Sequence, residues 1–359
     1  MGQFYTQMKI FHFKDKIDSL PKENDKILPP IHIRIKPTNV CSHNCEYCSY
    51  RAENLQLGKD MVIRDFIPKE KMMEIIDDLD DMGVKAVTFS GGGDPFCYPY
   101  LLETAQKFSK TKVKFAALTN GAMMKGEVAK VFAKYATWVR VSIDGWDDKS
   151  YSEFRKVPLG EFSKVMENIE AFCRYKKEYN GKCYFGVSII TGKKNAPHLF
   201  DMVKRFKSIG VNSVKIAPTI TSDDGKECNE YHKPIFDLVK NQIAKAKELE
   251  DKNFEIFDAY HSQLESFKKP YHWCPYAQIQ PIIGADLNVY PCHDKAYNLD
   301  EGLMGTIKDK SFKEYWMKNK NKFFEIDPSK DCNHHCAVDS RNRVILDYLD
   351  VDKEHLDFV

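Results

Sequence analysis

The sequence predicts an α/β fold in which six parallel strands, each followed by a helix, form a partial (βα)6 barrel of the TIM type. A small cysteine-containing domain is expected after it. Three observations support this. Short apolar runs alternate with amphipathic segments through the first two thirds of the chain, glycine-rich or polar turns follow several of these runs, and four cysteines gather in the last quarter.

The strands are predicted from apolar and β-branched runs that are bounded by turn-forming residues. An alternation of such strands with helices indicates a parallel sheet with right-handed crossovers, and ligands bind beyond the carboxyl ends of its strands. The turns after the strands are therefore where function is expected. The six predicted strands cover residues 31–35, 86–89, 113–118, 138–143, 183–190 and 213–216.

Helices are predicted where apolar residues recur at intervals of three and four positions. The first such segment follows Pro68, and segments 162–172 and 199–209 show the same periodicity. Gly210 marks the end of the last of these, because glycine accepts the left-handed conformation that ends many helices. We expect segment 230–250 to form a sixth helix that closes the barrel.

The chain is long enough, at 359 residues, for one barrel-sized domain and a smaller one. We expect an N-terminal extension over residues 1–30 and the barrel over 31–255. The cysteine-containing domain then covers 256–345, and a tail covers 346–359.

Charge and composition exclude several classes of function. The 54 Lys and Arg residues nearly balance the 52 Asp and Glu residues. This net charge gives no reason to expect a nucleic-acid partner, which would normally need a basic stripe. The first residues lack the basic start and apolar core of a signal peptide, and no run of apolar residues is long enough to span a membrane. We therefore expect a cytoplasmic protein with no membrane partner, in which the 11 cysteines are metal ligands or buried thiols rather than disulfides.

Three cysteines follow the first predicted strand in the spacing CxxxCxxC: Cys41, Cys45 and Cys48. Three thiolates can bind three irons of a 4Fe-4S cluster and leave the fourth iron open to a small ligand. The alternative is zinc with His43 as a fourth ligand, although zinc sites usually combine paired CxxC or Cys/His units. The spacing therefore favours an iron-sulfur cluster.

With Tyr47 between the second and third cysteines, residues 41–48 resemble the CxxxCxφC loop of the radical S-adenosylmethionine (SAM) superfamily. The resemblance implies that the open iron binds SAM and that the aromatic residue lies against the adenine. It also implies that an external flavodoxin or ferredoxin reduces the cluster, which then cleaves SAM to a 5'-deoxyadenosyl radical.

Further segments match this family in the expected order along the chain. A glycine-rich turn follows the second strand, Ser142 resembles the serine that reaches the ribose, and Arg155 resembles the arginine that pairs with the methionyl carboxylate. A guanidinium suits that role because it donates two parallel hydrogen bonds. Each residue alone also has an ordinary structural explanation. The implied cofactor-binding residues are Tyr47, Gly91, Gly92, Gly93, Asp94, Asn120, Ser142 and Arg155.

The region that begins at Cys274 resembles the SPASM and Twitch extensions of radical SAM enzymes. Many members have Gly where Leu287 stands, and a full SPASM domain has about seven cysteines. Four cysteines can fully ligate one second, auxiliary 4Fe-4S cluster, as in the Twitch type; a zinc ribbon is the alternative. The four candidate ligands are Cys274, Cys292, Cys332 and Cys336.

The resemblance implies hydrogen abstraction from a substrate, with the auxiliary cluster accepting an electron or positioning that substrate. Because the extension over 1–30 is too short for a leader-recognition domain, we favour a small-molecule substrate of the sugar, cyclitol or nucleoside type. The alternatives are a peptide-modifying maturase and, in another class, a zinc-stabilised binding module without turnover. The candidates for proton transfer, Asp144, His232, Tyr290 and His293, are not separated by the sequence, and the oligomeric state and the reaction's outcome stay open.

Overall fold

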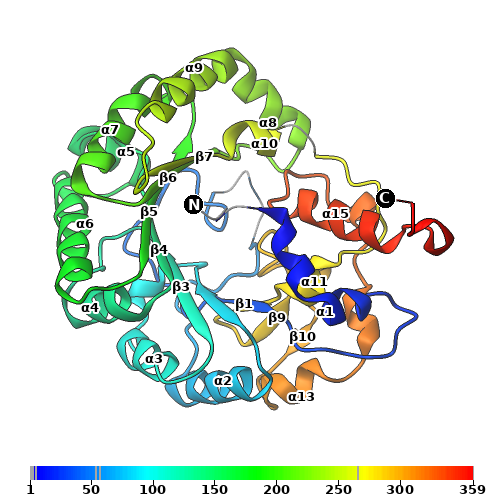
Figure 1. The fold of residues 1–359 in the computed structure, drawn as a ribbon. Coiled ribbons are helices and arrows are strands. Elements are labelled where there is room, and N and C mark those ends of the chain that lie inside the picture. Colours follow the sequence, from blue (N-terminus) through cyan, green and yellow to red (C-terminus); the bar gives the residue numbers. More distant parts are fainter. Residues whose placement is uncertain (1–3, 5, 53–54, 56–57, 265–266, 359) are drawn as a thin grey trace.

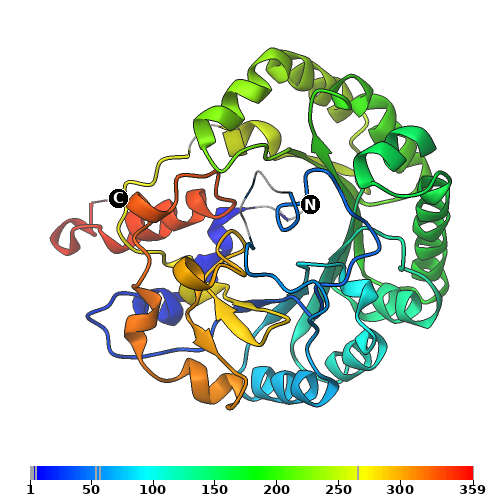
Figure 2. The ribbon, with the colours of Figure 1, turned by 180° about the vertical axis from the view of Figure 1, so that it is seen from behind.

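The computed structural model describes residues 4, 6–52, 55, 58–264 and 267–358. A single ten-stranded sheet in the order β10-β9-β8-β1-β2-β3-β4-β5-β6-β7 forms its core. Strands β1 to β7 pair in parallel with their neighbours. This part of the sheet curls into an open barrel with its helices on the outside (Figure 1), and Figure 2 views the barrel from behind.

The six predicted strands are all present, which confirms the predicted partial barrel. Their side chains alternate between the helix layer and the barrel interior, and Ile33, Ile35, Val139 and Val141 are completely buried. The strands are β1 (His32–Ile35), β2 (Ala86–Phe89), β3 (Lys114–Thr119), β4 (Trp138–Ser142), β5 (Tyr184–Thr191) and β6 (Ser213–Pro218).

The helices of the outer layer bury the apolar faces expected from the sequence. In α2, these buried residues are Met72, Ile75, Ile76 and Leu79. Gly210 ends α7 with a φ of 96°, the left-handed conformation predicted for it. The layer consists of α2 (Lys69–Asp81), α3 (Leu101–Phe108), α4 (Gly126–Tyr135), α5 (Asp148–Arg155), α6 (Glu161–Glu178) and α7 (Leu199–Ile209).

The prediction of one helix over residues 230–250 is wrong. The chain forms α8 (Gly225–His232), a 3-10 turn at Lys233–Ile235 and α9 (Phe236–Lys247). Pro234 lies in the turn, and proline has no N–H to donate within a helix, so the continuous hydrogen-bond pattern is broken there. A seventh strand, β7 (Glu255–Asp258), follows and pairs with β6.

The C-terminal region extends the barrel sheet instead of forming a separate one. β8 (Ile282–Ile283) pairs in parallel with β1, and β9 (Asn288–Tyr290) and β10 (Gly305–Thr306) continue the sheet in antiparallel pairs. Leu287, in the turn between β8 and β9, has a φ of 62°, a conformation that favours glycine. The pairing of β8 with β1 therefore places the C-terminal cysteines beside the first strand of the barrel.

Short helices complete the C-terminal region. They are α10 (Tyr260–Leu264), α11 (Tyr276–Ile279), α12 (Leu299–Gly302), α13 (Phe312–Trp316), α14 (Pro328–Asp331) and α15 (Asp339–Leu349). The N-terminal segment contributes a 3-10 turn (Gln7–His12) and α1 (Lys14–Asp18), which lies against α15 (Figure 1). Within the described residues, no helix is long and apolar enough to cross a membrane.

Candidate cofactor site

A cavity of about 300 Å³ opens at the carboxyl ends of the barrel strands. Every residue that the sequence analysis proposed for the first cluster and for SAM lines it. These residues are Cys41, Cys45, Tyr47, Cys48, Gly91, Gly92, Gly93, Asp94, Asn120, Ser142 and Arg155. The fold thus brings the loops after β1, β2, β3 and β4 to one place, as expected for parallel strands.

The loop that carries the first three cysteines is held by the side chain of Arg51. Its guanidinium donates to the backbone carbonyls of His43 at 3.0 Å and Asn39 at 3.1 Å. The His43 ring nitrogens contact Ser42 and Tyr151, each at 3.0 Å. Because both nitrogens already have partners, His43 is not poised as the fourth zinc ligand considered above.

The glycine-rich turn after β2 lies directly against this cysteine loop. Gly93 donates its N–H to the Thr38 carbonyl at 3.2 Å. A Cβ atom at Gly93 would come within 2.1 Å of the Val40 carbonyl oxygen, far inside a van der Waals contact. Only glycine lets the two backbones approach this closely, and the approach leaves the turn's backbone groups at the cavity wall.

The Asp94 carboxylate joins the glycine turn to the end of β3. It accepts hydrogen bonds from the backbone N–H of Phe96 at 2.9 Å and of Asn120 at 2.6 Å, and from the Thr119 hydroxyl at 3.0 Å. The side chain of Asn120 in turn donates to Ser42 at 3.2 Å. Asp94 therefore positions its neighbours around the cavity through bonds within the protein.

Arg155 brings a buried positive charge to the cavity. Its guanidinium donates to the Asp144 carboxylate at 2.5 Å and to the Ser142 hydroxyl at 2.9 Å, and Tyr47 also donates to Asp144. The Nε atom of Arg155 is buried and has no hydrogen-bond partner. Arg155 lines the cavity, and a guanidinium there fits a ligand that carries a carboxylate, such as the methionyl part of SAM.

Of the four candidates for proton transfer, His293 is the one that lines the cavity. His232 is occupied by the Thr219 carbonyl and the Tyr260 hydroxyl, each at 2.8 Å. Tyr290 donates to Asp286, and Asp144 is paired with Arg155.

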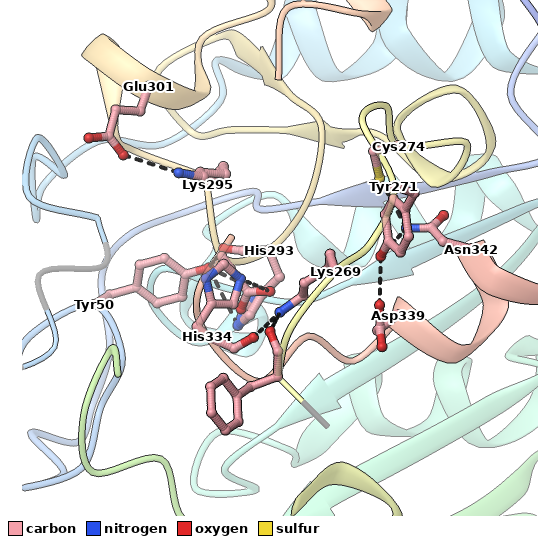
Figure 3. Close-up of polar contacts among 12 residues, drawn as sticks. Tyr50, Lys269, Tyr271, Cys274, His293, Lys295, Glu301, His334, Asp339 and Asn342 are labelled. Atoms are coloured by element: carbon pink, nitrogen blue, oxygen red, sulfur yellow. Dashed lines mark hydrogen bonds and ion pairs between the residues drawn. The ribbon is translucent and has the colours of Figure 1, made fainter. Parts of the chain in front are cut away.

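The four C-terminal cysteines come together from separate segments: before α11, after β9 and before α15. Burial raises the pKa of Cys292 well above its usual value, and Asp294, Cys336, Cys332 and Cys274 raise it further. The Asn342 amide donates to the Cys274 sulfur at 3.2 Å (Figure 3). These thiols are close enough to interact electrostatically, which fits a cluster that binds four thiolates and favours their ionised form.

In neither cysteine set do the sulfur atoms surround a position for a single metal ion. Among the residues that the structure describes, no three His, Cys, Asp or Glu side chains are placed to hold one metal ion. Each thiolate of a 4Fe-4S cluster binds a different iron, so the cluster does not require such an arrangement.

The site residues predicted from the sequence did not include Lys36 or Tyr50, and the position of His293 at the cavity was not predicted. Tyr50 and His293 line the cavity, and Lys36 lies behind its wall, completely buried. One signal in the sequence was available: His32, Arg34 and Lys36 alternate with isoleucines along the first strand, so their side chains share the face opposite to Ile33 and Ile35.

Comparisons with known proteins agree with this geometry. The Radical SAM superfamily model matches residues 35–194. A cysteine-type anaerobic sulfatase-maturating enzyme of Clostridium novyi is 26% identical over 331 residues, which cover 83% of this chain and 84% of that protein. The antilisterial bacteriocin subtilosin biosynthesis protein AlbA of Bacillus subtilis is 22% identical over 60% of this chain and 48% of its own.

Solved structures share the fold. Streptococcus suis SuiB bound to S-adenosylmethionine superposes with a TM-score of 0.60 at 15% identity, over 89% of this chain and 73% of that one. The anSMEcpe structure with bound AdoMet gives a TM-score of 0.55 at 20% identity, over 82% of both chains. The segment matched by the family model contains the first three cysteines, the glycine turn and Arg155. Residues 35–194 therefore form a Radical SAM domain, and the chain is an enzyme that uses SAM and 4Fe-4S clusters and continues past that domain into a C-terminal extension.

Proposed function

We propose that this enzyme modifies a peptide or protein substrate by a radical reaction. The observation that supports this substrate class is the extent of the similarity to the sulfatase-maturating enzyme, which covers 83% of the chain and so continues well past the Radical SAM segment. AlbA, named for bacteriocin biosynthesis, and SuiB, solved with a precursor peptide, support the same class. They favour it over the small polar metabolite that the sequence analysis preferred.

The first cysteine set and the cavity give each residue a role. Cys41, Cys45 and Cys48 would hold the SAM-binding cluster, and Arg155 would pair with the methionyl carboxylate. When bound, the reduced cluster and SAM supply the 5'-deoxyadenosyl radical that takes a hydrogen atom from the substrate. Around them, the apolar residues Leu118, Ile190, Pro218 and Ile220 line part of the cavity and would limit the access of water to the radical.

The other residues predicted to contact SAM line the rest of the cavity. The backbone of the glycine turn would meet the amino group of SAM, and Ser142 would reach the ribose. Asn120 and Tyr47 would complete the cavity wall, and Asp94 positions the turn against β3.

The second cysteine set would hold the auxiliary cluster. With Cys274, Cys292, Cys332 and Cys336 all available, each iron of that cluster has a thiolate ligand. A fully ligated cluster has no open iron for substrate, which favours electron transfer as its role. A flavodoxin or ferredoxin would supply the electron for the first cluster.

The experiment measures release of 5'-deoxyadenosine by the anaerobically purified protein with SAM and dithionite. We expect a panel of cysteine-containing peptides to increase the release, and a panel of sugars, cyclitols and nucleosides to leave it unchanged. Cys45→Ala should abolish the release, whereas Cys228→Ala, which removes a buried thiol outside both sets, should retain it. Stimulation by the metabolites alone would overturn the peptide proposal.

A further inference from the structure

Lys36 follows β1 and is completely buried behind the SAM cavity. Its Nζ atom donates to the Tyr50 hydroxyl at 2.6 Å and to the Gly91 carbonyl at 3.2 Å, and it contacts Nδ1 of His293 at 3.3 Å. The same atom lies 4.1 Å from the centre of the Tyr50 ring. A completely buried lysine is rare, so the three contacts need an explanation.

The three partners belong to the three parts of the cofactor site. Tyr50 comes two residues after Cys48, Gly91 begins the glycine turn, and His293 directly follows Cys292. Tyr50 also donates to the His293 carbonyl at 2.8 Å, and the two rings are perpendicular (Figure 3). One buried hydrogen-bond network therefore connects the first cysteine loop with the C-terminal extension.

None of these direct partners carries a formal negative charge. Burial lowers the pKa of Lys36 well below its usual value, and Arg34 lowers it further, while Asp294, Cys48 and Cys292 oppose the shift. Lys36 thus lies within electrostatic range of one cysteine from each set. A 4Fe-4S cluster with thiolate ligands has a net negative charge, and such a charge in either set favours the protonated lysine.

We propose that Lys36, protonated when the negatively charged clusters are bound, is a positioning residue shared by both: its ammonium group stabilises the reduced state of each cluster, and its hydrogen bonds hold the two cysteine loops together. The inference rests on the proposed assignment of Cys48 and Cys292 as ligands. Reduction adds one electron from the external donor to a cluster and breaks no bond. A nearby cation favours the more negative, reduced state and so raises the reduction potential.

The test is a redox titration of both clusters in the full-length, iron-loaded protein, followed by electron paramagnetic resonance. Lys36→Met keeps the length of the side chain and removes the charge, so the midpoint potentials of both clusters should fall. Lys16→Met is the matched control, because Lys16 is also buried but lies in the N-terminal segment, where it donates to the Leu28 carbonyl at 2.8 Å. This control should keep the wild-type potentials.

Two further variants separate charge from packing. Lys36→Gln removes the charge but keeps a hydrogen-bond donor, and it should lower both potentials as Lys36→Met does. Tyr50→Phe keeps the lysine and should leave the potentials nearly unchanged.

Unchanged potentials in both Lys36 variants, or a fall in one cluster only, would overturn the shared role. So would loss of iron from both Lys36 variants while the Lys16 variant loads fully, because Lys36 would then act in assembly and not on potential. Failure of the proposed function is distinct, since it appears as an iron-loaded wild-type protein that does not cleave SAM.

Discussion

The Asp144 carboxylate and the Arg155 guanidinium form a buried ion pair with a separation of 2.5 Å. Asp144 also accepts a hydrogen bond from the Ile190 N–H at 2.7 Å, which fixes the pair to β5, and another from Tyr47 in the cysteine loop. The guanidinium is therefore held at the cavity before any ligand binds, and it keeps one donor unused. Such preorganisation lowers the cost of ordering on binding.

Arg155→Met is expected to weaken SAM binding. Hydrogen bonds to a charged group contribute about 1.5–3 kcal/mol, so the dissociation constant should rise by roughly 10- to 150-fold. Equilibrium dialysis of SAM with the iron-loaded protein measures this. Arg205→Met removes an arginine that stacks on Phe162 outside the cavity and should leave the constant unchanged. Equal constants in both variants would contradict the role of Arg155.

Asp144→Ala is expected to destabilise the fold. Removing one partner of a buried ion pair leaves the other charge unpaired, which costs about 3–5 kcal/mol. Urea unfolding of the metal-free protein gives the change in the free energy of unfolding. The control is Asp77→Ala, whose partner Lys107 lies on the surface, and it should cost less than about 1 kcal/mol. A loss at Asp144 no larger than the control's would contradict this prediction.

Gly93→Ala is expected to prevent assembly of the first cluster. The added Cβ would meet the Val40 carbonyl at 2.1 Å, so the glycine turn and the cysteine loop would have to separate. Iron content should fall from about eight to about four per chain. Gly83→Ala has open space around its Cβ, so it should lose some stability from its φ of 75° and keep its iron. Full iron content in Gly93→Ala would show that the close approach is not required.

Cys332→Ala is expected to remove the second cluster and spare the first. Iron should again fall to about four per chain, while cleavage of SAM without substrate continues. Cys173→Ala changes a buried helix residue outside both sets and should retain about eight irons. If Cys332→Ala abolished SAM cleavage as well, the two cysteine sets would not form independent clusters.

His32 is expected to make the stability of the metal-free protein depend on pH. Burial, together with the positive charges of Arg34 and Arg341, lowers the pKa of His32 to about 3. The ring contacts the Thr88 hydroxyl and the Gln280 amide, and protonation would break the bond from Gln280. Between about pH 3 and 6.5 the unfolded chain binds a proton that the folded protein does not, so stability falls as the pH drops through this range.

The expected loss from this group between pH 7 and pH 5 is up to about 2 kcal/mol. Urea unfolding at the two pH values measures it, and His32→Gln should reduce the difference by that amount. An equal pH dependence in the variant and the wild type would contradict the assignment.

The barrel and the residues that line its candidate cofactor site could be predicted because their signals are local. Each strand from β1 to β6 is a short apolar run with a turn after it, and residues such as Gly93 and Arg155 stand at fixed places relative to those runs. Pro234 was also a local signal, because proline interrupts the hydrogen bonds of a helix, but the prediction treated residues 230–250 as one helix. β7 was missed because only its two central residues, Ile256 and Phe257, are apolar, and charged residues stand at both of its ends.

The contacts that depend on distant segments could not be predicted. β8 has two residues, and its pairing with β1 follows from the packing of the whole extension. Lys36 and His293 are 257 positions apart in sequence, and no periodicity relates them. Their contact follows from that pairing, because it places the segment after β9 behind the end of β1.

The most direct test of the account is electron paramagnetic resonance of the reduced first cluster in a variant that lacks Cys274, Cys292, Cys332 and Cys336. The account predicts about four irons per chain and a spectrum that changes when SAM is added, because SAM binds the iron that Cys41, Cys45 and Cys48 leave open. A spectrum that is the same with and without SAM would contradict it.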